Sequence, residues 1–145
     1  MRVVTVALAR EVITSAESNE LSLIGLVTGI IGPPPPPRPE GLPPDAVQII
    51  AFPCTILVVW QIEDTERGVE MPNAALTFEK DGEVLLRSPL PISTEQGFHR
   101  NKVKFGGLPV TDYGQYDFIV RFRDPSGAEQ AWIYPIAFRG ASESL

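Results

Sequence analysis

The chain has 145 residues, of which 43% are hydrophobic and 21% charged, and these values are typical of a globular rather than a disordered protein. Its 12 Lys and Arg against 18 Asp and Glu give a formal net charge of −6. That balance argues against general nucleic-acid binding, because such binding requires neutralisation of phosphates. With one cysteine, Cys54, the chain cannot form an intrachain disulfide.

The first residues contain no convincing targeting segment. An apolar run over 3–9 follows Arg2, but Arg10 and Glu11 interrupt it and no small-residue cleavage site follows. The next apolar run, 21–31, covers about half of the ~20 residues that a membrane span requires. We therefore expect a cytoplasmic protein without a membrane segment, and a lone cysteine is compatible with that compartment.

The beginning of the chain predicts a hairpin of two long strands. Val4, Val6 and Leu8 recur at the period of a strand, and a polar turn over 15–20 leads into the apolar run 21–31. This second strand is apolar on both faces, so we expect it to be buried, either within the core or in a homo-oligomer. Gly25 and Gly29 inside it indicate a bulge or a close backbone approach.

A proline-rich segment over 32–46, GPPPPPRPEGLPPDA, follows the hairpin. Proline lacks the backbone donor that a helix or a central strand needs, so polyproline II is the expected conformation. The next strand begins near Val47 and is expected to bend at Pro53. After the bend, one face of the strand carries the residues Cys54, Ile56, Val58, Trp60 and Ile62.

Later strands are predicted over 76–78, 83–87, 98–105, 116–123 and 130–139. Asp81-Gly82 is a strong hairpin signal, and the glycines and proline of 106–109 are predicted to end the strand before them. This makes about eight strands in one all-β domain over 1–140, with a short tail over 141–145. Two antiparallel sheets packed as a β-sandwich bury the apolar faces best, and a small closed barrel is the alternative.

The stretch TDYGQYDFIVRF holds Asp112, Gly114 and Tyr116 in a D-x-G-x-Y spacing. It resembles the corner of immunoglobulin-like sandwiches, in which a tyrosine hydroxyl bonds to backbone a few residues upstream. The resemblance implies that Asp112 caps the turn, that Gly114 has a positive φ and that Tyr116 supplies the hydroxyl. Phe118 stands where antibody domains have a cysteine, and Trp60 suits the buried tryptophan of such folds.

A second resemblance covers nearly the whole chain. The start VVTVALAREVITSAESNELSLIGLVTGI is similar to a family of short uncharacterised bacterial β-sandwich proteins, a domain of unknown function. The long proline-rich connection and the G-x-Y-x-F strand near the end fit this family as well. The resemblance implies a β-sandwich and assigns no activity or catalytic residue.

Residue types for metal or nucleophilic chemistry are sparse. The single histidine, His99, and the single cysteine, Cys54, lie far apart in the sequence. Glu63, Asp64 and Glu66 share one loop without the spacing of a calcium site, so we interpret it as a solvated acidic loop. No G-x-S-x-G elbow or phosphate-binding glycine loop occurs. We therefore expect no metal, no cofactor and no enzymatic activity.

Pro33, Pro36 and Arg38 are the first candidate partner-binding residues. A P-x-x-P pattern with a basic end matches ligands that aromatic grooves recognise in the polyproline II conformation. The alternative is a stiff surface connection between the layers of the sandwich.

Arg100, Lys102 and Lys104 are the second candidate, which we call the basic stripe. They alternate along one face of a predicted strand and suit an anionic partner. If that strand pairs with the strand over 116–123, Arg121 and Arg123 extend the stripe to five cations. The alternatives are an ordinary solvated face, or lysines that discourage edge-to-edge pairing of sheets.

Three functions remain open at this point. We favour a non-enzymatic protein-interaction or assembly module of a bacterial cytoplasmic system. Its expected partner is a protein, either another chain or a second copy of itself in a homo-oligomer. The alternative is a small-molecule or carbohydrate-binding sandwich in which Trp132 and Tyr134 form an aromatic platform, unless these two side chains belong to the core. The third is a hydrolase with a site around His99.

Overall fold

Strands form most of the chain in the computed structural model, which describes residues 1–18, 20–32, 48–70, 73–124 and 126–140. The strands of these ranges are β1 (Arg2–Thr14), β2 (Leu21–Leu26), β3 (Gly29–Ile31), β4 (Gln48–Gln61), β5 (Ala74–Lys80), β6 (Glu83–Leu90), β7 (Phe98–Val110), β8 (Gly114–Arg123) and β9 (Glu129–Arg139). A single 3-10 turn, η1 (Asp64–Glu66), is the only helical element in the same ranges, so the prediction of an all-β chain is confirmed. None of the described residues belongs to a helix with the length and apolar composition needed to cross a membrane.

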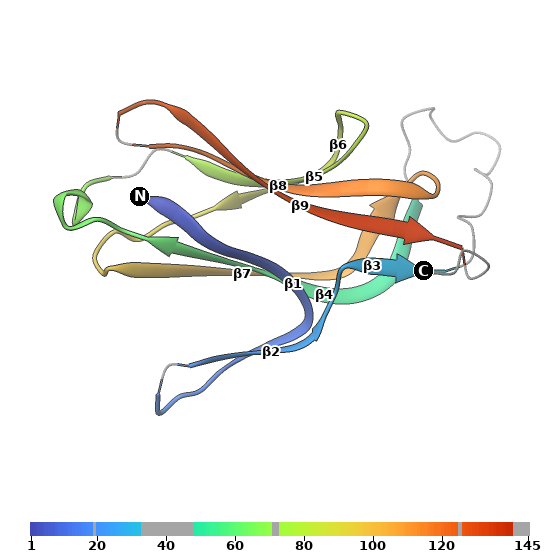
Figure 1. The fold of residues 1–145 in the computed structure, drawn as a ribbon, viewed down its shortest axis with the longest axis horizontal. Helices are drawn as coiled ribbons and strands as arrows, with labels where there is room; N and C mark the ends of the chain where they lie inside the picture. Colours follow the sequence, from blue (N-terminus) through green and yellow to red (C-terminus); the bar gives the residue numbers. More distant parts are fainter. Residues whose placement is uncertain (19, 33–47, 71–72, 125, 141–145) are drawn as a thin grey trace.

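The strands form two open sheets that face each other (Figure 1). The first sheet has the order β2-β1-β4-β7 and is antiparallel throughout. The second sheet has the order β3-β9-β8-β5-β6, in which only the β3–β9 pair is parallel. Because both sheets are open, the closed-barrel alternative does not apply.

Side chains from both sheets meet in one core. Trp60 of β4 is fully buried, and its ring meets Phe122 of β8 edge-on, with ring centroids 4.9 Å apart at 86°. Phe105 of β7 and Phe118 of β8 form a second contact between the sheets, with centroids 5.6 Å apart. Phe118 therefore links the two sheets by packing.

β4 shows why alternation predicted the core. Ile56, Val58 and Trp60 are all 0% exposed, and each is separated from the next by one residue, so they lie on the face that packs on the second sheet. The bend expected at Pro53 is present as a register shift between Ala51 and Cys54 in the pairing with β7. A proline at a bulge costs little, since no ladder bond is required there.

The predicted strand over 21–31 is two strands in different sheets, β2 and β3, which accounts for one strand more than expected. Burial of this segment within the core is also wrong, because Leu23, Ile24 and Leu26 are 40%, 47% and 60% exposed. Only Val27 and Ile30 are buried, where the chain crosses from one sheet to the other. Gly25, with φ +67°, interrupts the pairing of β2 with β1, which resumes where Leu26 pairs with Ala9. The apolar residues on both faces of 21–31 therefore belong to an exposed edge strand, β2, and to the segment that crosses from it to β3 in the other sheet.

The predicted end of a strand at 106–109 is likewise wrong, since β7 continues to Val110. A Cβ at Gly107 would lie 2.5 Å from the carbonyl oxygen of Ile50, so glycine allows β4 and β7 to approach closely. Pro109 is tolerated because β7 is an edge strand, where a missing backbone donor costs little.

The hairpin predicted at Asp81-Gly82 is confirmed between β5 and β6. Asp81 and Gly82 have φ values of 50° and 80°, and positive values at both central residues are typical of the type I′ turn that suits the twist of a hairpin.

Candidate functional site

The first candidate for partner binding is the proline-rich segment. Pro33, Pro36 and Arg38 lie outside the described residues, so their role in recognition stays a prediction.

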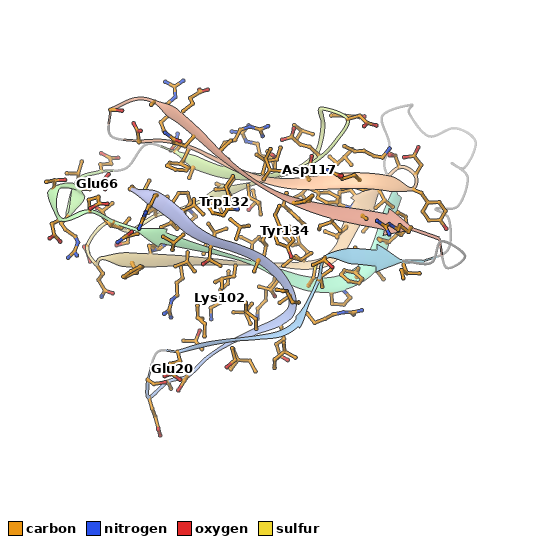
Figure 2. The ribbon with its side chains drawn as sticks, viewed as in Figure 1. Glu20, Glu66, Lys102, Asp117, Trp132 and Tyr134 are labelled. Carbon is orange, nitrogen blue, oxygen red and sulfur yellow. The ribbon has the colours of Figure 1, made fainter. Side chains whose placement is uncertain are left out.

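The basic stripe lies on β7, at one edge of the first sheet. Lys102 and Lys104 are exposed on the outer face, and Arg100 on the same face is half-buried. Lys102 Nζ donates a hydrogen bond to Thr14 Oγ1 at 2.5 Å, so part of the stripe contacts the β1–β2 hairpin (Figure 2). The position of the stripe on an edge strand favours the alternative that its lysines discourage edge-to-edge pairing.

Extension of the stripe to five cations is wrong. β7 pairs with β4, whereas β8 pairs with β5 and β9 in the other sheet. Arg121 and Arg123 therefore lie on the outer face of the second sheet, away from Arg100, Lys102 and Lys104. Alternation indicated correctly that these side chains point outward, but it contains no information on which strands are neighbours.

The hairpin formed by the end of β1 with β2 turns away from the two packed layers and lies beneath the first sheet (Figure 1). Exposed apolar side chains cluster on it, namely Ile13, Leu23, Ile24 and Leu26. In the described ranges β2 has no strand partner except β1, so the backbone groups along its other edge are not used in a ladder. Exposed apolar side chains next to an open backbone edge are typical of a contact surface.

The edge strands of the two sheets differ in how well they are protected against pairing with a strand of another molecule. β7 carries Lys102, Lys104 and Pro109, and β6 carries Arg87 and Pro89, which are the residue types that prevent strand addition. β2 has the sequence LSLIGL, without a charged residue or a proline. The fourth edge strand, β3, is also uncharged but has only three residues, so β2 is the longer unprotected edge.

The aromatic platform proposed for a small ligand is only partly present. Trp132 and Tyr134 pair in register with Val120 and Phe118, which places them on the inner side of β9 (Figure 2). The Tyr134 hydroxyl donates a hydrogen bond to the Val27 carbonyl oxygen, so it helps fix the crossover between the sheets. Trp132, 41% exposed, is left as a single aromatic side chain at the rim.

His99 belongs to a network of hydrogen bonds around Pro91. The Pro91 carbonyl oxygen lies 2.9 Å from His99 Nε2 and accepts a hydrogen bond from Asn101 Nδ2 at 2.8 Å. His99 Nδ1 accepts a hydrogen bond from the backbone N–H of Ser93 at 3.4 Å, so Nε2 carries the proton. Trp60 Nε1 donates to Asn101 Oδ1 at 2.7 Å. Both ring nitrogens of His99 therefore contact backbone, in the manner of a structural histidine.

Cys54 is a buried, free thiol on β4. Burial raises the pKa of the Cys54 thiol to about 11, against a smaller opposite effect of Arg10. The thiol is accordingly protonated at neutral pH, and a protonated thiol is a poor nucleophile.

The corner at Tyr116 has the hydrogen bonds of a tyrosine corner. Its buried hydroxyl donates to the Asp112 carbonyl oxygen and accepts from the backbone N–H groups of Thr111, at 3.1 Å, and Asp112, at 3.2 Å. Gly114 has a backbone φ angle of 140°, which residues with a Cβ atom rarely adopt.

Sequence reasoning missed the role of Lys80 at this corner. Lys80 Nζ lies 2.6 Å from Asp112 Oδ1 and 5.6 Å from the ring centroid of Tyr116. The Asp112 carboxylate thus binds a cation from β5 instead of capping the turn. This hydrogen bond lowers the pKa of Asp112 and raises the pKa of Lys80.

The expected acidic loop is not fully solvated. Glu66 is buried, and its carboxylate pairs with the Met1 ammonium group and accepts a hydrogen bond from the Glu63 N–H at 3.0 Å. Asp64 remains exposed and pairs with Arg67. No signal in the sequence connects Glu66 to Met1, since the contact depends on β1 and β4 being neighbours.

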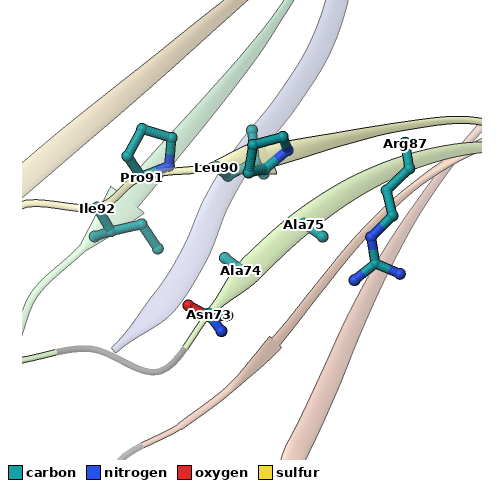
Figure 3. Close-up of a pocket in the computed structure, with 8 residues that line it drawn as sticks. Asn73, Ala74, Ala75, Arg87, Leu90, Pro91 and Ile92 are labelled. Carbon is teal, nitrogen blue, oxygen red and sulfur yellow. The ribbon is translucent and has the colours of Figure 1, made fainter.

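Two adjoining hollows lie on the outer face of the second sheet. The first, of about 670 Å³, is lined by β5, β6 and the residues after β6 (Figure 3). The second, of about 460 Å³, extends from β6 across β5 to β8 and β9. Asn73, Ala75 and Arg87 line both hollows.

Comparison with protein-family models, with curated proteins and with solved structures finds no match to the chain. The functional conclusion therefore depends on the geometry described above.

Proposed function

We propose that the chain is a non-enzymatic protein-interaction or assembly module that pairs through β2 with a second copy of itself. The observation that carries the proposal is the edge strand β2, which combines an open backbone edge with exposed Leu23, Ile24 and Leu26. In strand addition, backbone hydrogen bonds supply affinity and side chains supply specificity.

A second copy is the partner that the symmetry of this edge favours. Two β2 strands related by a two-fold axis pair antiparallel, and because β2 contains no charged residue, the pairing leaves no charge of β2 unpaired. The first sheets of the two copies would join into one sheet with β2 at its centre. Because β2 has only six residues, we expect the contact to bury less than the ~800 Å² per partner of a standard interface and to have a dissociation constant on the order of micromolar.

Three finer assignments belong to the same proposal. An immunoglobulin-like topology is supported by the Tyr116 corner and by the buried Trp60 on β4. Membership in the family of short bacterial β-sandwich proteins is supported by the sequence features given above. A cytoplasmic location is supported by the free thiol of Cys54.

Sedimentation velocity over a range of concentrations tests the proposal. We expect wild type to dimerise and Ile24→Lys to stay monomeric, because a lysine on β2 opposes strand pairing. Val84→Lys is the matched control, since Val84 is also an exposed apolar residue of an edge strand, β6, in the other sheet. A wild type that stays monomeric at every concentration, or a Val84→Lys variant that loses the dimer as completely as Ile24→Lys, would overturn the proposal.

A further inference from the structure

Small side chains form the floor of the hollows on the second sheet. One row of residues in register across β6, β5, β8 and β9 consists of Pro89, Ala75, Arg121 and Ala131, in which Arg121 is the one long side chain. Ala75 and Ala131 flank the long side chain of Arg121, so the surface is low on both sides of it. Volumes of about 670 and 460 Å³ fall within the range of small-molecule sites.

Arg121 is held in place above this floor. Its Nη1 donates to Thr77 Oγ1 at 2.9 Å and to the Glu79 carboxylate, and both partners are buried. These bonds use one nitrogen, so the Nε and Nη2 groups of Arg121 keep donors for another acceptor. A guanidinium fixed in this way loses little side-chain entropy when it binds a ligand.

Arg87 and Arg123 complete a cluster of three guanidinium groups around the second hollow. Within the described part of the chain, Arg87 has no hydrogen bond or ion pair, and Arg123 binds Glu129 through Nη2 at 3.0 Å. With the carboxylates of Glu79 and Glu129, the cluster keeps one net positive charge in a chain whose net charge is −6. Arg87 lines both hollows, and Figure 3 shows its side chain beside the first one.

We propose that the second hollow binds a small organic anion, whose carboxylate or phosphate group is held between Arg87 and Arg121 while its apolar part lies on Ala75 and Ala131. Guanidinium groups bind both kinds of oxyanion through paired N–H donors. The site lies on the opposite sheet from β2, so it is independent of the proposed self-association.

Citrate and inorganic phosphate, titrated separately into the ¹⁵N-labelled protein, test this site by chemical-shift changes. We expect shifts at Ala75, Arg87 and Ala131 with at least one of the two probes. Shifts with citrate alone assign a carboxylate ligand, and shifts with phosphate alone assign a phosphate ligand.

Arg87→Gln is expected to weaken binding by about tenfold or more, because a charge-assisted bond pair is lost. Lys104→Gln is the matched control, since it removes the same charge from the outer face of the other sheet and is expected to leave the affinity unchanged. Because Arg87 and Lys104 are both exposed, we expect both variants to be folded, and their unfolding midpoints check this. Absence of shifts with both probes, or equal weakening by both substitutions, would overturn the proposal.

Discussion

β7 and β2 are the two edges of the first sheet, and they are stabilised in different ways. β7 pairs with β4 over its whole length and contributes Asn101 and Phe105 to the inner face, while Lys102 and Lys104 face solvent. Among the strands that the structure describes, β2 pairs only with the end of β1, and its apolar side chains Leu23, Ile24 and Leu26 are exposed. A charged edge strand such as β7 therefore obtains its stability from buried contacts on its inner face. An uncharged edge without such contacts has more to gain from a partner.

Replacement of Asn101 by leucine should have the largest effect, because it removes the buried polar contact of β7. Trp60 Nε1 would lose its acceptor, and a buried donor without a partner costs about 1–3 kcal/mol. We expect the free energy of unfolding to fall by about 2 kcal/mol, measured by urea titration with tryptophan fluorescence.

Leu23→Ala on β2 is the counterpart of that change. Because Leu23 is exposed, we expect a change within about 0.5 kcal/mol at concentrations where the protein is monomeric. Equal losses in Asn101→Leu and Leu23→Ala would contradict the difference between the two edges.

Tyr116→Phe should have the next largest effect, at the point where β7 leads into the second sheet. The buried hydroxyl makes three hydrogen bonds with the backbone of Thr111 and Asp112, and their loss should cost about 1–2 kcal/mol. The measurement is the unfolding midpoint in urea. An unchanged midpoint would mean that the corner does not stabilise the connection.

Tyr134→Phe makes the corresponding change where β2 leads into β3. The hydroxyl donates one hydrogen bond, to the Val27 carbonyl oxygen, and Tyr134 is only half-buried. We expect a loss of about 0.5–1 kcal/mol, smaller than that of Tyr116→Phe. Calorimetry of the two variants side by side gives the order, and a larger loss for Tyr134→Phe would reverse the comparison.

The Asp112–Lys80 pair should give the smallest effect, because the Asp112 side chain is 69% exposed. The hydrogen bond from Lys80 lowers the pKa of Asp112, so its contribution is present above the unfolded pKa of about 3.9 and is lost as pH falls through the lower folded value. The same hydrogen bond raises the pKa of Lys80. The contribution of Lys80 to the free energy of unfolding is therefore present below its unfolded pKa of about 10.4 and is lost as pH rises through the higher folded value.

Thermal unfolding of wild type and Asp112→Asn as a function of pH measures this contribution. The difference between the two midpoints should be present at neutral pH, vanish in acid and shrink in high salt. A difference that is the same at every pH and salt concentration would show that charge is not its cause.

The sequence was informative where a structural signal is local. Alternation placed Ile56, Val58 and Trp60 on the inner face of β4, and Asp81-Gly82 located a hairpin, because both depend on a few neighbouring residues. The spacing of Asp112, Gly114 and Tyr116 likewise pointed to a corner whose hydrogen bonds span only five residues.

Features that depend on strand order could not be predicted. A two-residue period shows which side of a strand a residue faces but not which sheet the strand joins, so Arg121 was grouped with the basic stripe. The cluster of Arg87 and Arg121, and the pair of Met1 and Glu66, each unite residues far apart in the chain. For the apolar run over 21–31 the sequence leaves open burial in the core or in a homo-oligomer, because hydrophobicity alone does not distinguish a core strand from an exposed edge.

β1 is one continuous strand that belongs both to the packed layers and to the hairpin. Its residues from Arg2 to Ala9 pair with β4, and those from Ala9 to Thr14 pair with β2. Mechanical tension applied to the hairpin therefore passes along a single backbone into the β1–β4 ladder. Where that tension runs along the strands, the ladder is loaded in shear, so its hydrogen bonds resist together instead of opening one by one. A partner bound to β2 would consequently pull on the whole first sheet.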